Sequence, residues 1–279
     1  MYEIVLKENI LPAIDMVKVK APKIARKAQA GQFVIIRIDE FGERIPLTLA
    51  DWDEKEGTVT LIAMKVGTST YKLGELETGD YLQNIVGPLG KASEIEKFGT
   101  VICIGGGVGV APIFPIARAM KKAGNKVISI IGARSKELLF WESHLRSVSN
   151  TLIVTTDDGS YARKGLVTEP LKELLEAKEK IDRVIAIGPA IMMKFCSLTT
   201  LPFKVPTIVS LNSIMVDGTG MCGCCRVSID DDTRFVCVDG PEFDGHKVDW
   251  DILFKRQQTY LKEEKESLET WHSCKCHKS

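Results

Sequence analysis

The chain has no excess charge of either sign, no long hydrophobic run and few aromatic residues. Its 37 acidic residues balance 37 basic ones, which gives no electrostatic basis for binding nucleic acid or an anionic membrane. The longest apolar runs, such as 101–104 and 127–131, are strand-length and far too short to span a membrane. The N-terminus begins with a strand-like alternation and has no secretory h-region, so we expect a cytoplasmic protein without nucleic-acid or membrane partners.

Hydrophobic residues make up 44% of the 279 residues, enough for a proper core and for two domains, or one domain with an appendage. Eight cysteines are present. In a reducing compartment, cysteines indicate metal or redox chemistry more than disulfides.

Near the C-terminal end, three candidate metal ligands follow the pattern Asp217-x4-Cys222-x2-Cys225, and a fourth candidate, Cys237, lies further on. This is the spacing of the plant-type [2Fe–2S] frame, Cys-x4-Cys-x2-Cys…Cys, with a carboxylate in the first position. Interspersed glycines let the backbone wrap closely around inorganic sulfide. We predict Asp217, Cys222, Cys225 and Cys237 as ligands and interpret Cys224 as a non-ligand.

Zinc, a disulfide and unreactive thiols are the alternatives for this segment. Structural zinc usually pairs two short ligand hairpins, whereas the second half here is a lone Cys237, and no His lies between Asp217 and Cys237. A carboxylate is an uncommon, hard ligand for iron–sulfur clusters. The spacing nevertheless favours an iron–sulfur cluster.

Residues 1–98 are predicted to form a small antiparallel β-barrel, because short alternating segments are separated by glycine turns. The expected strands are 2–7, 13–20, 32–38, 47–51, 58–64 and 81–86, with one short helix over 69–76.

Two motifs in this part carry polar groups suited to phosphate. Arg44-Ile-Pro-Leu-Thr48 supplies a guanidinium, whose fork fits phosphate oxygens, and a hydroxyl. Lys65-Val-Gly-Thr-Ser-Thr70 places a glycine and three hydroxyls at an expected helix start, where free N–H groups favour phosphate. Taken alone, each motif is weak evidence, because an arginine before a proline is usually a solvated loop residue and a Thr/Ser cluster is usually a helix N-cap.

Residues 99–212 are predicted to form a doubly wound parallel sheet of about five strands, because strands and helices alternate. The strand at 100–104 leads into Gly105–Gly109 and a helix ending at Lys122, which is the context of a nucleotide-phosphate loop, although the G-x-G-x-x-G order is absent. The further expected strands are 126–131, 152–155, 183–187 and 207–211, and the helices are 136–146, 167–175 and 190–198.

The carboxyl ends of parallel strands meet at one edge of such a sheet, where ligands bind. The residues expected at this edge are Gly106, Gly107, Val108, Gly109, Ala133, Arg134, Asp157 and Gly188. Arg134 is placed to touch an adenosine ribose or a 2′-phosphate, so the sequence leaves NAD and NADP both open.

Residues 213–245 form the predicted cluster segment, and residues 246–279 are expected to be a C-terminal helix with a tail. The stretch 250–269 is charged and amphipathic, typical of a solvated or subunit-contacting helix. Cys274, Cys276 and His277 are candidate metal ligands, but a tag or a frayed chain end is the favoured interpretation of this tail.

The order of barrel, glycine-loop α/β domain and [2Fe–2S] segment resembles the ferredoxin–NADP reductase superfamily over about the first 260 residues. Its flavin motif resembles Arg44–Thr48, its second flavin-phosphate element resembles Gly67–Thr70, and its pyridine-nucleotide loop resembles Gly105–Pro112. The resemblance implies FAD and NAD(H), with NADP(H) possible, and assigns hydride transfer to the flavin rather than to a side chain. The implied flavin-binding residues are Arg44, Pro46, Leu47, Thr48, Ala63, Lys65, Gly67, Thr68, Ser69 and Thr70.

Two subfamilies carry a cluster in this order. Val216–Cys225 and the Cys-Val-Asp-Gly-Pro-Glu-Phe stretch ending at Phe243 resemble the small subunit of NADH-dependent reduced ferredoxin:NADP oxidoreductase, also described as sulfide dehydrogenase. This implies a heterodimer with a larger bifurcating subunit that holds a flavin and [4Fe–4S] clusters and serves ferredoxin indirectly. The alternative is the electron-transfer subunit of dihydroorotate dehydrogenase, which uses four cysteines, so Asp217 favours the first subfamily.

Overall fold

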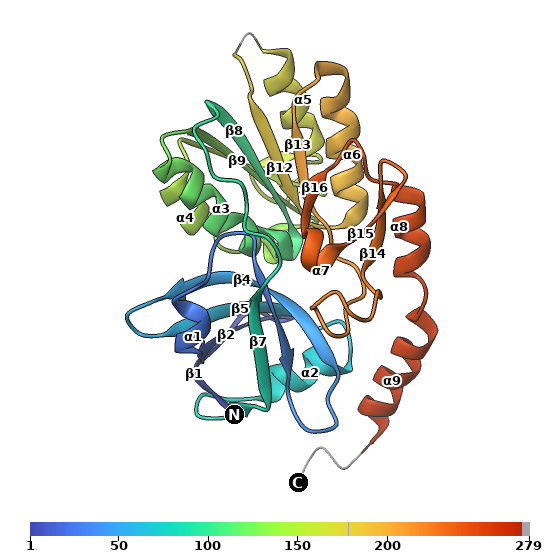
Figure 1. Cartoon of the computed structure of the whole chain (residues 1–279). Coiled ribbons are helices and arrows are strands. Elements are labelled where there is room, and N and C mark those ends of the chain that lie inside the picture. The colour runs from blue at the N-terminus through green and yellow to red at the C-terminus, as the bar shows by residue number, and fades with distance from the viewer. Residues whose placement is uncertain (178, 275–279) are drawn as a thin grey trace.

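The computed structural model describes residues 1–177 and 179–274. It has two lobes joined by the segment after strand β7, and two C-terminal helices run down one side from the upper lobe to the lower (Figure 1).

The lower lobe is the predicted antiparallel barrel. Its seven strands follow the order β6-β1-β2-β5-β4-β3-β7, and their inward side chains, such as Ile4, Val34 and Leu61, form a separate core. Its elements are β1 (Tyr2–Leu11), β2 (Ile14–Lys20), α1 (Pro22–Ala25), β3 (Phe33–Arg37), β4 (Arg44–Asp53), β5 (Thr58–Met64), α2 (Thr68–Glu75), β6 (Tyr81–Leu82) and β7 (Asn84–Leu89).

The upper lobe is a seven-stranded sheet in the order β11-β10-β9-β8-β12-β13-β16. Its strands are β8 (Thr100–Gly106), β9 (Lys126–Ala133), β10 (Thr151–Thr156), β11 (Arg163–Lys164), β12 (Arg183–Ile187), β13 (Thr207–Ser210) and β16 (Glu242–Asp244). The five predicted strands pair in parallel, which confirms the doubly wound prediction. The sheet is wider than predicted because β11 and β16 are too short to produce a sequence pattern, and β16 pairs antiparallel with β13.

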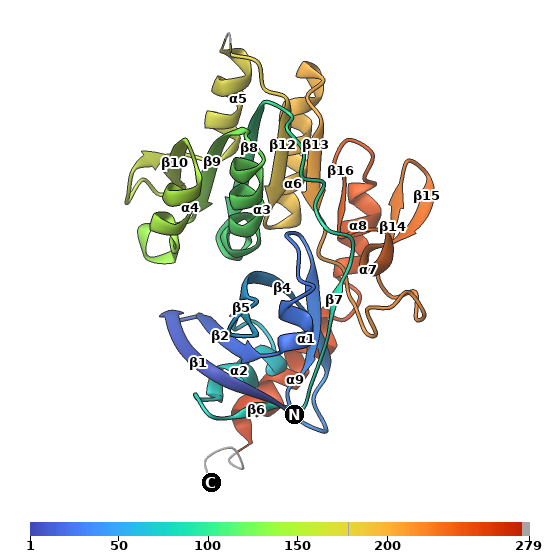
Figure 2. The same cartoon turned by 60° about the vertical axis from the view of Figure 1, so that its left-hand side comes forward.

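Helices cover both faces of this sheet (Figure 2). They are η1 (Gly107–Gly109), α3 (Val110–Lys122), η2 (Lys136–Leu138), α4 (Glu142–Val148), α5 (Thr168–Glu176), α6 (Ala190–Thr200) and η3 (Leu201–Phe203). The helix predicted over 136–146 is wrong. Phe140 is buried in the core and Trp141 adopts a left-handed φ of 55°, so the chain makes a 3-10 turn and then a separate helix.

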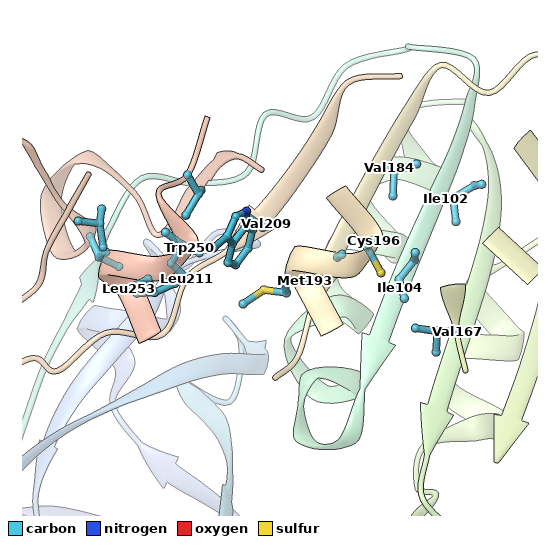
Figure 3. Packing of buried hydrophobic residues seen from close by; sticks show 14 of the residues in the cluster. Ile102, Ile104, Val167, Val184, Met193, Cys196, Val209, Leu211, Trp250 and Leu253 are labelled. Carbon is cyan, nitrogen blue, oxygen red and sulfur yellow. The ribbon is translucent and has the colours of Figure 1, made fainter. Parts of the chain in front are cut away.

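The largest core joins the sheet to the C-terminal segments. Apolar side chains of β8, β12 and β13 pack with those of α6 and with the first C-terminal helix (Figure 3). The labelled members are Ile102, Ile104, Val167, Val184, Met193, Cys196, Val209, Leu211, Trp250 and Leu253.

Between β13 and β16 lies the predicted cluster segment, which contains the hairpin β14 (Arg226–Ile229) and β15 (Asp232–Phe235) and the short helix α7 (Val236–Asp239). One continuous helix over 250–269 is also wrong, since α8 (Trp250–Gln257) and α9 (Leu261–Ser273) are separate. Trp250 and Leu253 bury α8 in the upper lobe, whereas α9 lies along α2 of the barrel, so the chain turns between them. Within the described ranges, no helix is long and apolar enough to cross a membrane.

Candidate functional site

Two of the predicted cysteine ligands meet between the cluster loop and α7. Cys225 ends the loop, Cys237 lies in α7, and their Sγ atoms are 3.2 Å apart. The N–H of Val236 donates to the Cys225 carbonyl at 3.0 Å and holds the two segments together. Both side chains are buried, and burial, followed by the contact with Cys225, raises the pKa of the Cys237 thiol to about 12.

Asp217 and Cys222 form a second pair on the same loop. The carboxylate accepts the N–H of Thr219 at 2.8 Å and the N–H of Cys222 at 3.0 Å. The Thr219 N–H, ahead of the Cys222 N–H, lowers the pKa of Asp217, so this side chain is an anion at neutral pH. The pKa of Cys222 is also lowered, first by the backbone N–H of Cys224. Both shifts are toward the ionised form, which is the form that binds a metal.

This two-plus-two arrangement suits a cluster with two irons better than a single ion. Across residues 1–177 and 179–274, no three His, Cys, Asp or Glu side chains come close enough together to hold one metal ion, whereas structural zinc needs four convergent ligands. The 3.2 Å separation of Cys225 and Cys237 also exceeds a disulfide bond of about 2.05 Å. A [2Fe–2S] cluster takes protein ligands on each of two irons, so two neighbouring pairs fit it.

The loop that carries these ligands rests on the barrel. A Cβ at Gly218 would come within 2.8 Å of Ile35 in β3 and 2.9 Å of Leu89 in β7, and its φ is +76°. Only glycine permits both this approach and this backbone conformation. The close fit places the cluster segment directly against the predicted flavin lobe (Figure 1).

The other described cysteines differ in their surroundings. Cys224 is half-buried beside Cys222, and its hydrogen bond to that side chain raises the pKa of Cys224. Cys103 and Cys196 lie in the cores, where burial raises the pKa of each thiol to about 12. Cys274 is exposed, and Cys276 and His277 of the predicted tail site lie outside the described residues.

The two predicted flavin motifs come together on one side of the barrel. Arg44 begins β4 with an exposed side chain, and Thr48 pairs with Phe33 in β3. Glu43, next to Arg44, accepts a hydrogen bond from the Ser69 hydroxyl at 2.7 Å, which joins this strand to the first turn of α2.

The hydroxyls at the start of α2 are already engaged. Thr70 accepts the N–H groups of Val66 and Gly67, and Thr68 contacts Ser267 of α9 at 2.9 Å. Phosphate would therefore be bound here by the free N–H groups of the first helical turn rather than by these hydroxyls.

The side chains of two predicted flavin-binding residues, Ala63 and Lys65, are engaged inside the barrel. Lys65 forms an ion pair with buried Asp15 at 3.1 Å, and Asp15 also pairs with Lys7 at 3.3 Å. Ala63 is buried in the barrel core. The Lys65 N–H also donates to the Ala13 carbonyl at 2.8 Å, so the side chains of Ala63 and Lys65 and this N–H are all engaged within the barrel.

The predicted nucleotide residues line one edge of the upper sheet. Gly106 is in register with Gly132, the residue before Ala133, and Ala133 is in register with Thr156, the residue before Asp157. The sheet order reverses between β8 and β12, which is the point where doubly wound sheets bind ligands.

The glycine loop packs tightly on one side and is open on the other. A Cβ at Gly109 would lie 2.1 Å from the carbonyl oxygen of Ile187 and 2.8 Å from Gly188. Gly107 has a φ of +53° and no neighbour near a Cβ. Arg134 and Asp157 are exposed directly after the next two strands, β9 and β10. Backbone N–H groups at the start of α3 thus face a space that can admit a phosphate.

Several residues that shape this site carry no sequence signal. Arg226 and Arg256 donate to loop carbonyls, and Ser93 of the interlobe segment donates to half-buried Glu242 at 2.5 Å. These contacts join residues far apart in the chain, so spacing alone could not reveal them.

Two family models match this chain, one over the nucleotide-binding sheet and one over the cluster segment. A family model described as the oxidoreductase NAD-binding domain matches residues 103–197. A second, described as the iron–sulfur cluster binding domain of dihydroorotate dehydrogenase B, matches residues 212–249.

Relatives match nearly the whole chain. The dihydroorotate dehydrogenase B (NAD(+)) electron transfer subunit homolog of Thermotoga maritima is 48% identical over 267 residues, covering 96% of this chain and 94% of the relative. The corresponding probable subunit of Methanocaldococcus jannaschii is 40% identical over 185 residues, 66% of this chain and 69% of the relative.

Solved structures agree with these matches. A chain from the NADH-dependent reduced ferredoxin–NADP oxidoreductase structure, which was solved for insight into flavin-based electron bifurcation, superposes with a TM-score of 0.93 at 46% identity, covering 98% of each chain. A ferredoxin NADP+ reductase from Neisseria gonorrhoeae with bound FAD and NADP shares the fold at 18% identity and a TM-score of 0.59, covering 73% of this chain and 90% of that one. The chain belongs to the family of electron-transfer subunits that comprises those of dihydroorotate dehydrogenase B and their homologues, within the ferredoxin–NADP reductase superfamily.

Proposed function

We propose that this chain is the electron-transfer subunit of an NAD(P)H-dependent flavin and iron–sulfur oxidoreductase. The observation that carries the proposal is the seat of the cluster loop on β3 and β7 of the barrel, where Gly218 contacts Ile35 and Leu89. It brings the four candidate cluster ligands against the lobe proposed to hold the flavin.

The barrel, residues 1–98, would hold FAD. Arg44 and the free N–H groups at the start of α2 would bind its pyrophosphate, and Pro46, Leu47 and Thr48 would line its ring. In residues 99–212, the loop from Gly106 to Gly109 would bind the dinucleotide phosphates, with Ala133, Arg134, Asp157 and Gly188 beside it. The exposed Arg134 leaves room for either NAD(H) or NADP(H).

Residues 213–245 would hold the [2Fe–2S] cluster through Asp217, Cys222, Cys225 and Cys237. Binding of FAD in the barrel would supply hydride-accepting chemistry opposite the nicotinamide, and a cluster on these four residues would supply one-electron transfer. The chain itself orients both groups and keeps Cys225 and Cys237 away from water.

The electrons would leave toward a larger subunit that carries flavin and [4Fe–4S] clusters and serves ferredoxin indirectly. Val216, Met221 and Val238 are apolar but 47%, 88% and 39% exposed on the cluster segment, a cost that a docked partner would offset. Helices α8 and α9 follow this segment in the chain. We place the complex in the cytoplasm, where a reducing poise keeps cysteines available as ligands.

A second candidate is the electron-transfer subunit of dihydroorotate dehydrogenase, which the 48% identity to the Thermotoga maritima homolog supports. The carboxylate at Asp217 favours the ferredoxin:NADP type. Assaying the purified complex with dihydroorotate and with reduced ferredoxin distinguishes the two.

Anaerobic purification of the chain with counts of iron, sulfide and flavin tests the core proposal. We expect one FAD, two irons and two sulfides per chain. Flavin without iron would leave a plain flavin reductase, stoichiometric zinc would indicate a structural metal site, and absence of flavin would refute the catalytic account.

A further inference from the structure

Two arginines bind consecutive carbonyl groups in the turn between two of the candidate cluster ligands. Arg226 Nη1 donates to the Gly223 carbonyl at 3.2 Å, and Arg256 Nη2 donates to the Cys224 carbonyl at 2.8 Å. These carbonyls belong to the only two residues between Cys222 and Cys225.

The carbonyl directions fix the directions of the neighbouring N–H groups. The peptide bonds after Gly223 and Cys224 are trans, so each N–H points away from the carbonyl of its own peptide unit. With both carbonyls turned toward the guanidinium groups, the N–H groups of Cys224 and Cys225 are turned toward the opposite side of the loop. The contact of the Cys224 N–H with the Cys222 side chain agrees with this orientation.

Arg256 is firmly placed to act in this way. It lies in the last turn of α8, whose first turn is capped by Asp249 and whose Leu253 is 1% exposed in the core. The next residue, Gln257, donates to the carbonyl of Asn212 at 2.7 Å, near the other end of the loop. A single helix end therefore holds the loop at two points, one before the first candidate ligand and one between Cys222 and Cys225.

The space between α8 and the loop is small. A cavity of about 10 Å³, the size of one water molecule, lies among Ser213, Cys224, Arg226 and Arg256. Arg226 is exposed, whereas Arg256 is half-buried, so the Arg256 hydrogen bond is the one that partial shielding from solvent strengthens.

We propose that Arg226 and Arg256 are positioning residues that tune the cluster, because they hold the Gly223 and Cys224 carbonyls outward and aim the following N–H groups at its sulfur atoms. Hydrogen bonds to cluster sulfurs favour the reduced state and raise the reduction potential. The inference rests on the proposed function, since it assumes that a [2Fe–2S] cluster occupies this loop.

The test is an EPR-monitored redox titration of the complete chain in wild type, R256M, R256K and K255M. Removing the Arg256 donor in R256M should lower the ratio of reduced to oxidised cluster at a fixed potential by about 2- to 10-fold, the equivalent of one hydrogen bond. R256K keeps a donor and should stay closer to wild type. K255M removes an exposed charge from the same helical turn and should leave the potential unchanged.

An unchanged potential in R256M, or an equal drop in K255M, would overturn the inference, since the second result would reduce the effect to general charge. If R256M takes up no cluster, R256K provides the test. A wild-type potential and wild-type iron content in R256K would support the positioning role. Loss of iron from R256K would overturn the inference. Absence of iron and sulfide from the wild-type chain would instead refute the proposed function itself.

Discussion

At the scale of single residues, the first ligand separates this chain from an all-cysteine cluster. Asp217→Cys should keep the cluster but change its visible spectrum and lower its potential, because thiolate donates more electron density than carboxylate. Optical spectra and a redox titration measure both. If neither property changes, Asp217 is not a ligand.

Cys224→Ser is the matched control for the ligand set. Its carbonyl, not its sulfur, is the group held by Arg256, so we expect normal iron and sulfide content. Loss of the cluster in this variant would make Cys224 a ligand in place of its neighbour Cys222.

Gly109 and Gly107 should respond differently to alanine. Gly109→Ala forces a methyl group against the carbonyl of Ile187, and such overpacking costs about 1–3 kcal/mol in unfolding free energy. Gly107→Ala faces open space with a left-handed φ, at a cost of about 1–2 kcal/mol, but its methyl group lies where a phosphate would approach. Denaturant unfolding measures the loss of unfolding free energy, and NADH titration measures the loss of affinity. Relative to its loss of stability, Gly107→Ala should lose more NADH affinity than Gly109→Ala does. The opposite order would contradict this account.

The ligand spacing and the glycine loop were readable in the sequence because each lies within one short stretch with a characteristic order. The arginine contacts, the Glu43–Ser69 link and the Lys65–Asp15 pair were not, because each depends on how distant strands and helices meet. For the same reason, the sequence assigned Lys65 a cofactor role that its side chain cannot fill while it holds Asp15.

At the scale of secondary-structure elements, α9 links the C-terminus to the flavin lobe. None of its residues is fully buried, yet Ser267 contacts Thr68, and His272 packs edge-on against Tyr71 with ring centroids 5.0 Å apart. These contacts lie on α2, the helix proposed to bind the flavin pyrophosphate.

Ending the chain after Tyr260 should therefore weaken FAD binding several-fold while the upper lobe stays folded. The free N–H groups of α2 would lose the helix that holds them in place. Flavin fluorescence measures the affinity, and Lys262→Ala, on an exposed position of α9, is the control. Unaltered FAD affinity in the shortened chain would show that α9 plays no part in the flavin site.

The predicted elements failed where tertiary contacts override local pattern. The stretches 136–146 and 250–269 both have helical composition, but burial of Phe140 breaks the first and a change of packing partner divides the second. The barrel and the parallel strands were predictable because their apolar periodicity continues over whole elements.

At the scale of the whole molecule, Glu242 is a half-buried carboxyl group between the lobes. It accepts the Ser93 hydroxyl, and burial raises its pKa above the ordinary value. A carboxyl group with a raised pKa in the folded state stabilises the fold below its unfolded pKa, and this stability is lost as pH rises through the folded pKa.

Glu242→Gln removes this dependence while keeping an acceptor for Ser93. The variant should gain stability relative to wild type as the pH rises from about 4 toward neutrality. Thermal unfolding across pH measures the difference, and Glu96→Gln, an exposed carboxylate on the same interlobe segment, should show no such trend. A constant difference between Glu242→Gln and wild type would rule out this role.

The most direct test of the account is anaerobic reduction of the complete chain by NADH or NADPH, followed by EPR. We predict bleaching of the flavin together with the signal of a reduced [2Fe–2S] cluster, and loss of that signal with retention of flavin bleaching in Cys225→Ser. The contradicting result is a wild-type chain that contains iron and whose flavin is reduced, but that gives no reduced-cluster signal with either nucleotide. The solution potential must be low enough to reduce the cluster. This result would contradict the electron-transfer function.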